Sequence, residues 1–394
     1  MKETKRMRRF LCTLCAAVLV FTIAFPTAAY AAQEPAAETV QSLTAAQAKQ
    51  MQQADAAVTA LTESVDFAAL SADGRAAAAR AQLETLVQQG LVQKGSIYTD
   101  KENGMVSFAY TCGALGGILL QDPEEENTAA DLQLAQPVVQ EAENGRYGTA
   151  VLYYAFDNTV NSTRYPNYAY MQSYWTSVGL DTKLDTTVTV SDLRHMGDYD
   201  LCVLSTHGAY YTYEYGWLRK HQTTEPILLL TEQSTFWNDL RYGMELLNHR
   251  VIKVNGAYAV TPSFFAAAYR SGSLNGTVVI SETCEFYGRS GHVNTSIAEA
   301  LLAGGASAVV GYVNNVYSVY SRSMLWATVN RMLEDDTVQQ AVDFGLDLYG
   351  SDDIVWYNAQ GGRRPHAVAS YPIICGQQNA KLPALETAEL QQAA

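Results

Sequence analysis

Short apolar runs alternate with helical patterns along the chain from about residue 148 to residue 376. Runs typical of buried strands lie at 150–156, 186–190, 201–205, 276–281, 307–312 and 369–375. Between the first two runs, Tyr168, Met171, Trp175 and Val178 recur at the spacing of one helix face, and Gly179 ends that helix. Because strands that alternate with helices pair in parallel through crossovers, the pattern predicts an α/β fold with a mostly parallel sheet flanked by helices.

The residues before this part follow another pattern. Thr44 with Gln47 forms a capping box that predicts a helix to about residue 61, and Ser71 opens a second helix that ends before Gly90. Apolar runs on both sides of Glu102-Asn103-Gly104 predict a β-hairpin. The chain therefore has an N-terminal helical and hairpin region before its α/β domain.

Five regions follow from these patterns. They are a signal peptide at 1–31, an N-terminal helical and hairpin region at 32–120, an acidic linker at 121–147, an α/β domain at 148–376 and a flexible tail at 377–394.

The signal peptide is predicted from three features. Basic residues between 2 and 9 precede an apolar run at 10–25, and Ala29-Tyr30-Ala31 fits the small-x-small cleavage pattern. The run is shorter than the roughly 20 residues that a membrane span needs. We therefore expect export, cleavage and a secreted, extracellular protein with no membrane attachment afterwards.

Charge bears on the kind of partner. Residues 1–31 hold five basic side chains and one acidic one, so their removal changes the net charge from −14 to −18. A strongly acidic chain does not bind nucleic acid through phosphate contacts. We expect no nucleic-acid partner.

Two of the strand runs end next to residues that can act as a catalytic base or a nucleophile. The run 201–205 leads into Thr206-His207-Gly208, and the run 276–281 leads into Glu282-Thr283-Cys284. Parallel strands end on one edge of a sheet, and that edge is where α/β sites form. The sequence thus predicts that a histidine and a cysteine meet there as base and nucleophile.

Other candidates for these roles are weaker. Cys202 and Cys375 lie within apolar strand patterns, as buried free thiols do. His292 is a rival base because it follows Cys284 by only eight residues, but it is expected in a loop before a helix. Ser290 stands in Gly-Arg-Ser-Gly, which is not a nucleophile elbow. Paired CxxC and HExxH motifs do not occur, so no metal site and no cofactor are predicted.

These strand ends resemble those of the caspase-like cysteine peptidases, nearest to the clostripain, gingipain and legumain branches. Thr206-His207-Gly208 after an apolar strand is similar to their histidine motif, and Glu282-Thr283-Cys284-Glu285 to their acidic-x-Cys turn. The run 305–311 resembles the strand after the nucleophile, and 371–376 the strand that closes such domains. The resemblance covers about 148–376 and implies a caspase-like sheet in this part.

The resemblance also implies roles for residues. His207 would be the base and Cys284 the nucleophile, with the backbone N–H groups of Gly208 and Cys284 holding the oxyanion. Glu282 would line the pocket for the residue before the scissile bond, which favours Arg or Lys through a charge-assisted hydrogen bond. Thr206 is a further substrate-binding candidate, and it stands where legumain carries Asp, which weakens an Asn-specific interpretation.

Asn314 and Asn315 follow a strand of the same sheet and are further candidates for substrate contact. Tyrosines at 210, 211, 213 and 215, with Trp217, could hold an extended peptide, but a hairpin with cross-strand aromatic pairs is the favoured interpretation.

The leading hypothesis is a secreted cysteine endopeptidase acting on peptide or protein substrates. The N-terminal region is then a candidate pro-segment, released by cleavage at Lys101 or Arg146 if the specificity is basic. The alternative is a catalytically inactive caspase-like domain that acts as an extracellular binding or adhesion protein. A transpeptidase or ligase with the same dyad stays open, because transfer to an amine shares the first step.

Overall fold

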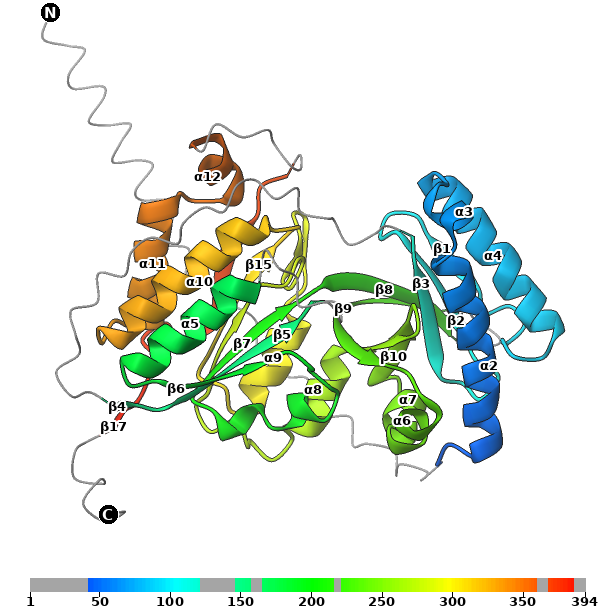
Figure 1. Ribbon diagram of the computed structural model, residues 1–394, viewed down its shortest axis with the longest axis horizontal. Coiled ribbons are helices and arrows are strands. Elements are labelled where there is room, and N and C mark those ends of the chain that lie inside the picture. The colour runs from blue at the N-terminus through cyan, green and yellow to red at the C-terminus, as the bar shows by residue number, and fades with distance from the viewer. Residues whose placement is uncertain (1–41, 121–145, 157–164, 216–220, 360–367, 386–394) are drawn as a thin grey trace, which may run out of the picture. The chain divides into compact units, whose positions relative to one another are not determined.

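The computed structural model describes residues 42–120, 146–156, 165–215, 221–359 and 368–385, and Figure 1 shows their elements. Residues 42–394 form one compact unit. The predicted signal peptide and most of the acidic linker lie outside the described residues. In the described part, no helix is both long and apolar enough to cross a membrane.

The first sheet carries the predicted strand ends. Its strands are β5 (Thr149–Ala155), β6 (Asp181–Asp185), β7 (Leu201–Thr206), β12 (Val278–Ser281), β15 (Ala308–Val313) and β16 (Tyr371–Gly376). They follow the order β16-β15-β12-β7-β5-β6. All neighbours pair in parallel except β15 and β16, which are antiparallel.

Helices cover both faces of this sheet because the buried strands alternate their side chains between two cores. Leu152 and Tyr154 face one core, with α5 (Tyr165–Ser177), α10 (Ser318–Leu333), α11 (Val338–Tyr349) and α12 (Asp353–Ala359). Val151 and Tyr153 face the other core, with α8 (Pro262–Ala268) and α9 (Ser296–Ala303). The prediction of an α/β fold is confirmed at this level.

A second sheet was not predicted. Its strands, in order, are β1 (Tyr98–Asp100), β2 (Met105–Ala109), β3 (Leu115–Leu119), β10 (Val251–Val254), β11 (Ala257–Val260), β9 (His221–Gln233) and β8 (Gly208–Tyr215). Only β3 and β10 pair in parallel. Both sheets are therefore mixed, and the expectation of a single mostly parallel sheet was too simple.

The β3–β10 pairing joins the N-terminal region to the rest of the fold. Helices α2 (Ala45–Thr62), α3 (Val65–Ala68) and α4 (Ala72–Gln88) pack beside this sheet with α6 (Phe236–Arg241) and α7 (Gly243–Leu247). Residues from these helices share one hydrophobic core with strands of the first sheet. The helical and hairpin region is thus built into the same compact unit.

Several local predictions are confirmed. Thr44 and Gln47 form the capping box of α2, and Ser71 caps α4. The Tyr-rich segment is a hairpin, since β8 pairs with β9 from Gly208–Leu228 to Tyr215–His221. The expected cross-strand aromatic pairs are not formed there, because Pro226, Glu225 and Thr223 lie opposite Tyr210, Tyr211 and Tyr213. Trp217 lies outside the described residues.

Other local predictions were wrong. The strand expected at 186–190 is irregular, and β6 lies at 181–185 instead. The described start of the predicted flexible tail is packed: Ala380 and Leu382 are buried, and β17 (Ala384–Leu385) pairs with β4 (Arg146–Tyr147). The short elements η1 (Asp192–Arg194), η2 (Met196–Asp198), β13 (Gly288–Arg289) and β14 (His292–Val293) complete the fold.

Candidate active site

Strands β7 and β12 deliver the predicted site residues to one edge of the first sheet. The two strands are parallel neighbours, with Leu204 opposite Ser281 in register. Both strands therefore end at the same edge of the sheet. Strand β7 continues into His207 and Gly208, and β12 continues toward Cys284. A Cβ atom built on Gly208 would lie 2.2 Å from the carbonyl oxygen of Cys284 and 2.4 Å from Cγ2 of Thr283. Only glycine permits this close approach.

The side chains of His207 and Cys284 are both half-buried. The imidazole packs edge-on against Phe156, with ring centroids 4.9 Å apart. The thiol of Cys284 lies 3.7 Å from the carbonyl oxygen of Val316 and packs against the core beneath α5 and α10. Cys112 and Cys375 are half-buried as well, so among the described cysteines only Cys202 has a core thiol, and Cys375 is more exposed than the sequence pattern predicted.

Glu282 is a buried carboxylate beside Cys284, with 5% of its surface exposed. Hydroxyl groups of Tyr168, Ser205 and Ser321 donate to its two oxygens, with Tyr168 at 2.8 Å and Ser321 at 3.4 Å. Buried carboxylates are retained where such donors compensate lost hydration. These side chains form a buried polar cluster between β7, β12, α5 and α10, which we call the Glu282 chamber.

A second charge faces the same chamber. Burial and the negative charge of Glu282 hold the pKa of Tyr168 well above its usual value, while the positive charge of Arg322 works in the opposite direction. Arg322 is 5% exposed, and its Nη1 atom is buried without a hydrogen-bond partner among the described residues. The chamber thus contains both a carboxylate and a guanidinium group.

The loop after Cys284 is held by Glu285 and Asn314, which both adopt left-handed backbone conformations with φ of 55° and 66°. The N–H group of Glu285 donates to the carbonyl of Asn314 at 2.8 Å. Arg289 binds the Glu285 carboxylate through two nitrogens, at 2.6 and 3.1 Å. Strained residues held by such contacts are common at functional sites.

Asn314 was predicted to contact substrate, but its side chain is engaged within the protein. Its Oδ1 accepts the N–H of Ser290 at 2.8 Å, and its Nδ2 donates to Ser290 Oγ and to the carbonyl of Ala369. The structure gives Asn314 a positioning role for the loop that follows Cys284. Asn315 is exposed.

Thr206 is also engaged elsewhere. It is buried, and its hydroxyl donates to the carbonyl of Leu229, which ties β7 to β9. The N–H of Leu229 donates a hydrogen bond to the carbonyl of His207 at 2.9 Å. These contacts fix the backbone where the first sheet meets the second, and a substrate contact of Thr206 stays a prediction.

The rival residues lie on the loop's outer side. His292 is exposed on β14, opposite Arg289 of β13, and Ser290 is exposed at the turn between these strands. Burial raises the pKa of the other described thiols, Cys112, Cys202 and Cys375. A thiol with a raised pKa stays protonated and reacts slowly.

Sequence reasoning missed the residues that complete the chamber and the loop: Phe156, Tyr168, Ser205, Arg289, Ser321 and Arg322. Only Ser205 carried a usable signal. It is a polar residue inside an apolar strand run, at a position that faces the same core as Val203. The others come from helices or loops whose distance from Cys284 depends on tertiary packing.

The site is defined here by its geometry alone. Among the described residues, no group of three or more His, Cys, Asp or Glu side chains could hold a metal ion. Neither the family models nor the curated proteins with which the chain was compared give a match.

Proposed function

We propose that this protein is a caspase-like cysteine endopeptidase in which His207 is the base and Cys284 the nucleophile. The observation that supports it best is the contact of Gly208 with the backbone of Cys284 at the ends of two parallel strands. This contact brings two backbone N–H groups, a histidine and a half-buried thiol to one sheet edge. Acyl transfer by a cysteine needs a base, a thiol and oxyanion donors near one another, so this juxtaposition supports the proposal.

The proposed reaction has two stages. His207 takes the proton of the Cys284 thiol, the thiolate attacks the substrate carbonyl, and the negative oxygen is held by the N–H groups of Gly208 and Cys284. The C–N bond then breaks as His207 gives its proton to the leaving amine, which leaves a thioester. Water, deprotonated by His207, attacks the thioester and frees the carboxylic acid and Cys284.

Glu282 supports a preference for Arg or Lys before the scissile bond. Its carboxylate is buried beside Cys284, where a basic side chain would form a charge-assisted hydrogen bond. Arg322 in the same chamber opposes this preference. The preference for Arg or Lys therefore has one buried charge in its favour and one against it, whereas the assignment of His207 and Cys284 does not depend on either charge. Secretion through the signal peptide belongs to the proposal as well and rests on the sequence pattern at 1–31.

The test is cleavage of a peptide library by the wild type and four variants. We expect Cys284→Ala and His207→Ala each to lower kcat/KM by at least about a thousandfold. The matched controls Cys112→Ala and His292→Ala should keep it within about threefold, because these residues lie outside the proposed dyad. A peptidyl ketone should label Cys284 and spare Cys202 and Cys375.

Different results point to different failures. Equal and slow labelling of all thiols without cleavage would favour a binding or adhesion protein. Cleavage sites with Asn or with no constant residue before the scissile bond would contradict the role given to Glu282 and leave the peptidase assignment intact.

A further inference from the structure

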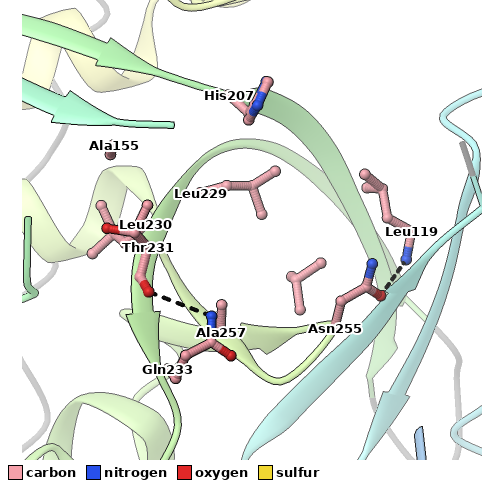
Figure 2. Close-up of a pocket in the computed structure, with 10 residues that line it drawn as sticks. Leu119, Ala155, His207, Leu229, Leu230, Thr231, Gln233, Asn255 and Ala257 are labelled. Atoms are coloured by element: carbon pink, nitrogen blue, oxygen red, sulfur yellow. Dashed lines mark hydrogen bonds between the residues drawn. The ribbon is translucent and has the colours of Figure 1, made fainter. Parts of the chain in front are cut away.

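A cavity of about 180 Å³ lies beside His207, between the first sheet and the second (Figure 2). Strands β9 and β3, the β10–β11 turn and the end of β5 form its walls. Its apolar lining consists of Leu119, Ala155, Leu229, Leu230, Val254 and Ala257. His207, Thr231, Gln233 and Asn255 supply its polar groups. Mostly apolar walls with a few polar groups are typical of ligand sites.

The cavity and the Glu282 chamber lie on opposite faces of the first sheet. Ala155 and Leu230 belong to the core on the α8 and α9 face. Tyr168, which donates to Glu282, belongs to the core beneath α5 and α10, and Cys284 packs against that core. The Glu282 chamber and the cavity therefore flank the proposed site from opposite faces of the first sheet.

We infer that this cavity binds the side chain of the residue directly after the scissile bond, and that this side chain is apolar and about as large as leucine or phenylalanine. The inference rests on the proposed function and adds the substrate class on the leaving side. His207 must protonate the leaving amine, so the residue that carries this amine lies against the imidazole. The cavity beside that imidazole is then the nearest space for its side chain.

The size and lining decide which side chains fit. Apolar cavities of roughly 150 Å³ bind benzene, so a cavity of this volume holds a branched aliphatic or a phenyl group. Its lining contains no Asp, Glu, Lys or Arg, so a charged side chain would lose hydration without compensation.

The test uses peptides that differ only after the scissile bond, with Leu, Gly or Asp at that position. We expect the wild type to cleave the Leu peptide at least about tenfold better than the Gly peptide, and the Asp peptide worst, because a buried leucine gains that much from transfer out of water. Ala257→Phe fills the cavity and should reduce the preference for the Leu peptide over the Gly peptide to about twofold. Cys112→Ala changes a residue outside the cavity, so this control should keep the preference.

Binding is measured in parallel with fluorescein-labelled peptides and the Cys284→Ala variant, which needs no turnover. Cleavage that depends on Cys284 but shows no preference after the scissile bond overturns the inference and spares the proposed function. Absent cleavage with tighter binding of the Leu peptide, abolished by Ala257→Phe, overturns the peptidase assignment and supports the cavity as a side-chain site. The wild-type comparison of peptides decides the case if Ala257→Phe fails to fold.

Discussion

Glu225 lies on β9 opposite Tyr211 of β8, and its carboxylate is largely removed from water. Desolvation raises its pKa from an ordinary value of 4.5 to about 7. Between these two pH values the folded state holds a proton that the unfolded state has lost. The free energy of unfolding therefore falls as the pH rises through this window, and the full cost of burying the charge is reached above pH 7.

Replacing Glu225 tests this cost. Glu225→Gln should raise the free energy of unfolding at pH 8 by up to about 3 kcal/mol relative to the wild type, and the difference should shrink toward zero at pH 4.5. Urea unfolding of both proteins at the two pH values measures it, with the exposed Glu63→Gln as control. A constant difference at both pH values would show that the carboxylate does not titrate in this window.

Single residues also explain the geometry around Cys284. Gly208 is required because a Cβ would collide with the Cys284 carbonyl, and Gly311 makes room for the ring of Phe286, 2.4 Å from its Cβ position. The motif Thr206-His207-Gly208 therefore contains the candidate base and also the glycine that lets the segments after β7 and β12 approach each other. The left-handed conformation of Glu285 carried no such signal, because its residue type does not favour it.

Helix α2 is joined to the second sheet by a buried ionic cluster. Lys253 on β10 is fully buried and contacts both Asp55 of α2 and Asp239 of α6, with Nζ 2.8 Å from Asp239 Oδ2. Tyr110 donates to Asp55, and Tyr258 donates to Asp239 at 2.8 Å. Desolvation raises the pKa of Asp55, while the charge of Lys253 counteracts that rise.

Removing the cation should therefore be costly. Lys253→Met should lower the free energy of unfolding by about 3–5 kcal/mol at pH 7, because it leaves two carboxylates buried without a cation. The loss should be smaller at pH 5, because burial raises the pKa of Asp55 and this carboxyl is then more easily protonated. Guanidinium unfolding measures both values. The exposed Lys49→Met should change stability by less than about 0.5 kcal/mol, and an equally small effect of Lys253→Met would contradict this account.

Element prediction succeeded where the pattern was local and failed where pairing was distant. The capping box of α2, the N-cap of α4 and the β8–β9 hairpin need only neighbouring residues, and they were predicted. The segment 186–190 has high β-propensity but gains no strand partner, although Val188 and Val190 are buried. Polar β6 is a strand because it pairs at the sheet edge with β5.

Strand β3 also could not be predicted from local sequence, because its stability depends on distant contacts. Its sequence contains Gly116 and Gly117, which disfavour strands in isolation. Both glycines are needed here because Phe108 lies 2.4 Å from the Cβ position of Gly116, and Met105 and Tyr211 crowd that of Gly117. A contact with β8, about one hundred residues away, cannot be inferred from the local pattern.

At the scale of the whole molecule, the N-terminal region reaches the candidate site. Leu119 of β3 lines the cavity beside His207, and its N–H donates to Asn255 at 3.0 Å. Arg289, in the loop after Cys284, donates to the carbonyl of Glu102 in the β1–β2 turn at 3.2 Å. A region that lines the site and shares its core does not fit a detachable pro-segment.

Cleavage at Lys101 distinguishes a detachable pro-segment from an N-terminal region that is an integral part of the fold. Lys101 is exposed in the β1–β2 turn and pairs with Asp73 at 2.7 Å, so a protease can reach this turn. After cleavage, residues up to Lys101 would still hold α2, α4 and β1. These elements stay bound through the pairing of β1 with β2 and the contact of Asp55 with Lys253. Cleavage should therefore leave the two fragments together.

We expect this outcome when a site for a specific protease is placed in the turn 101–104. After cleavage, both fragments should elute together on size exclusion in native buffer and separate only in denaturant, with kcat/KM kept within about threefold of the uncut protein. The Lys253→Met background should release the N-terminal fragment at lower denaturant, because one of its two anchors is lost. Elution of a free N-terminal fragment from the native protein, with activity appearing only then, would restore the pro-segment, since the buried cluster would have failed to hold α2.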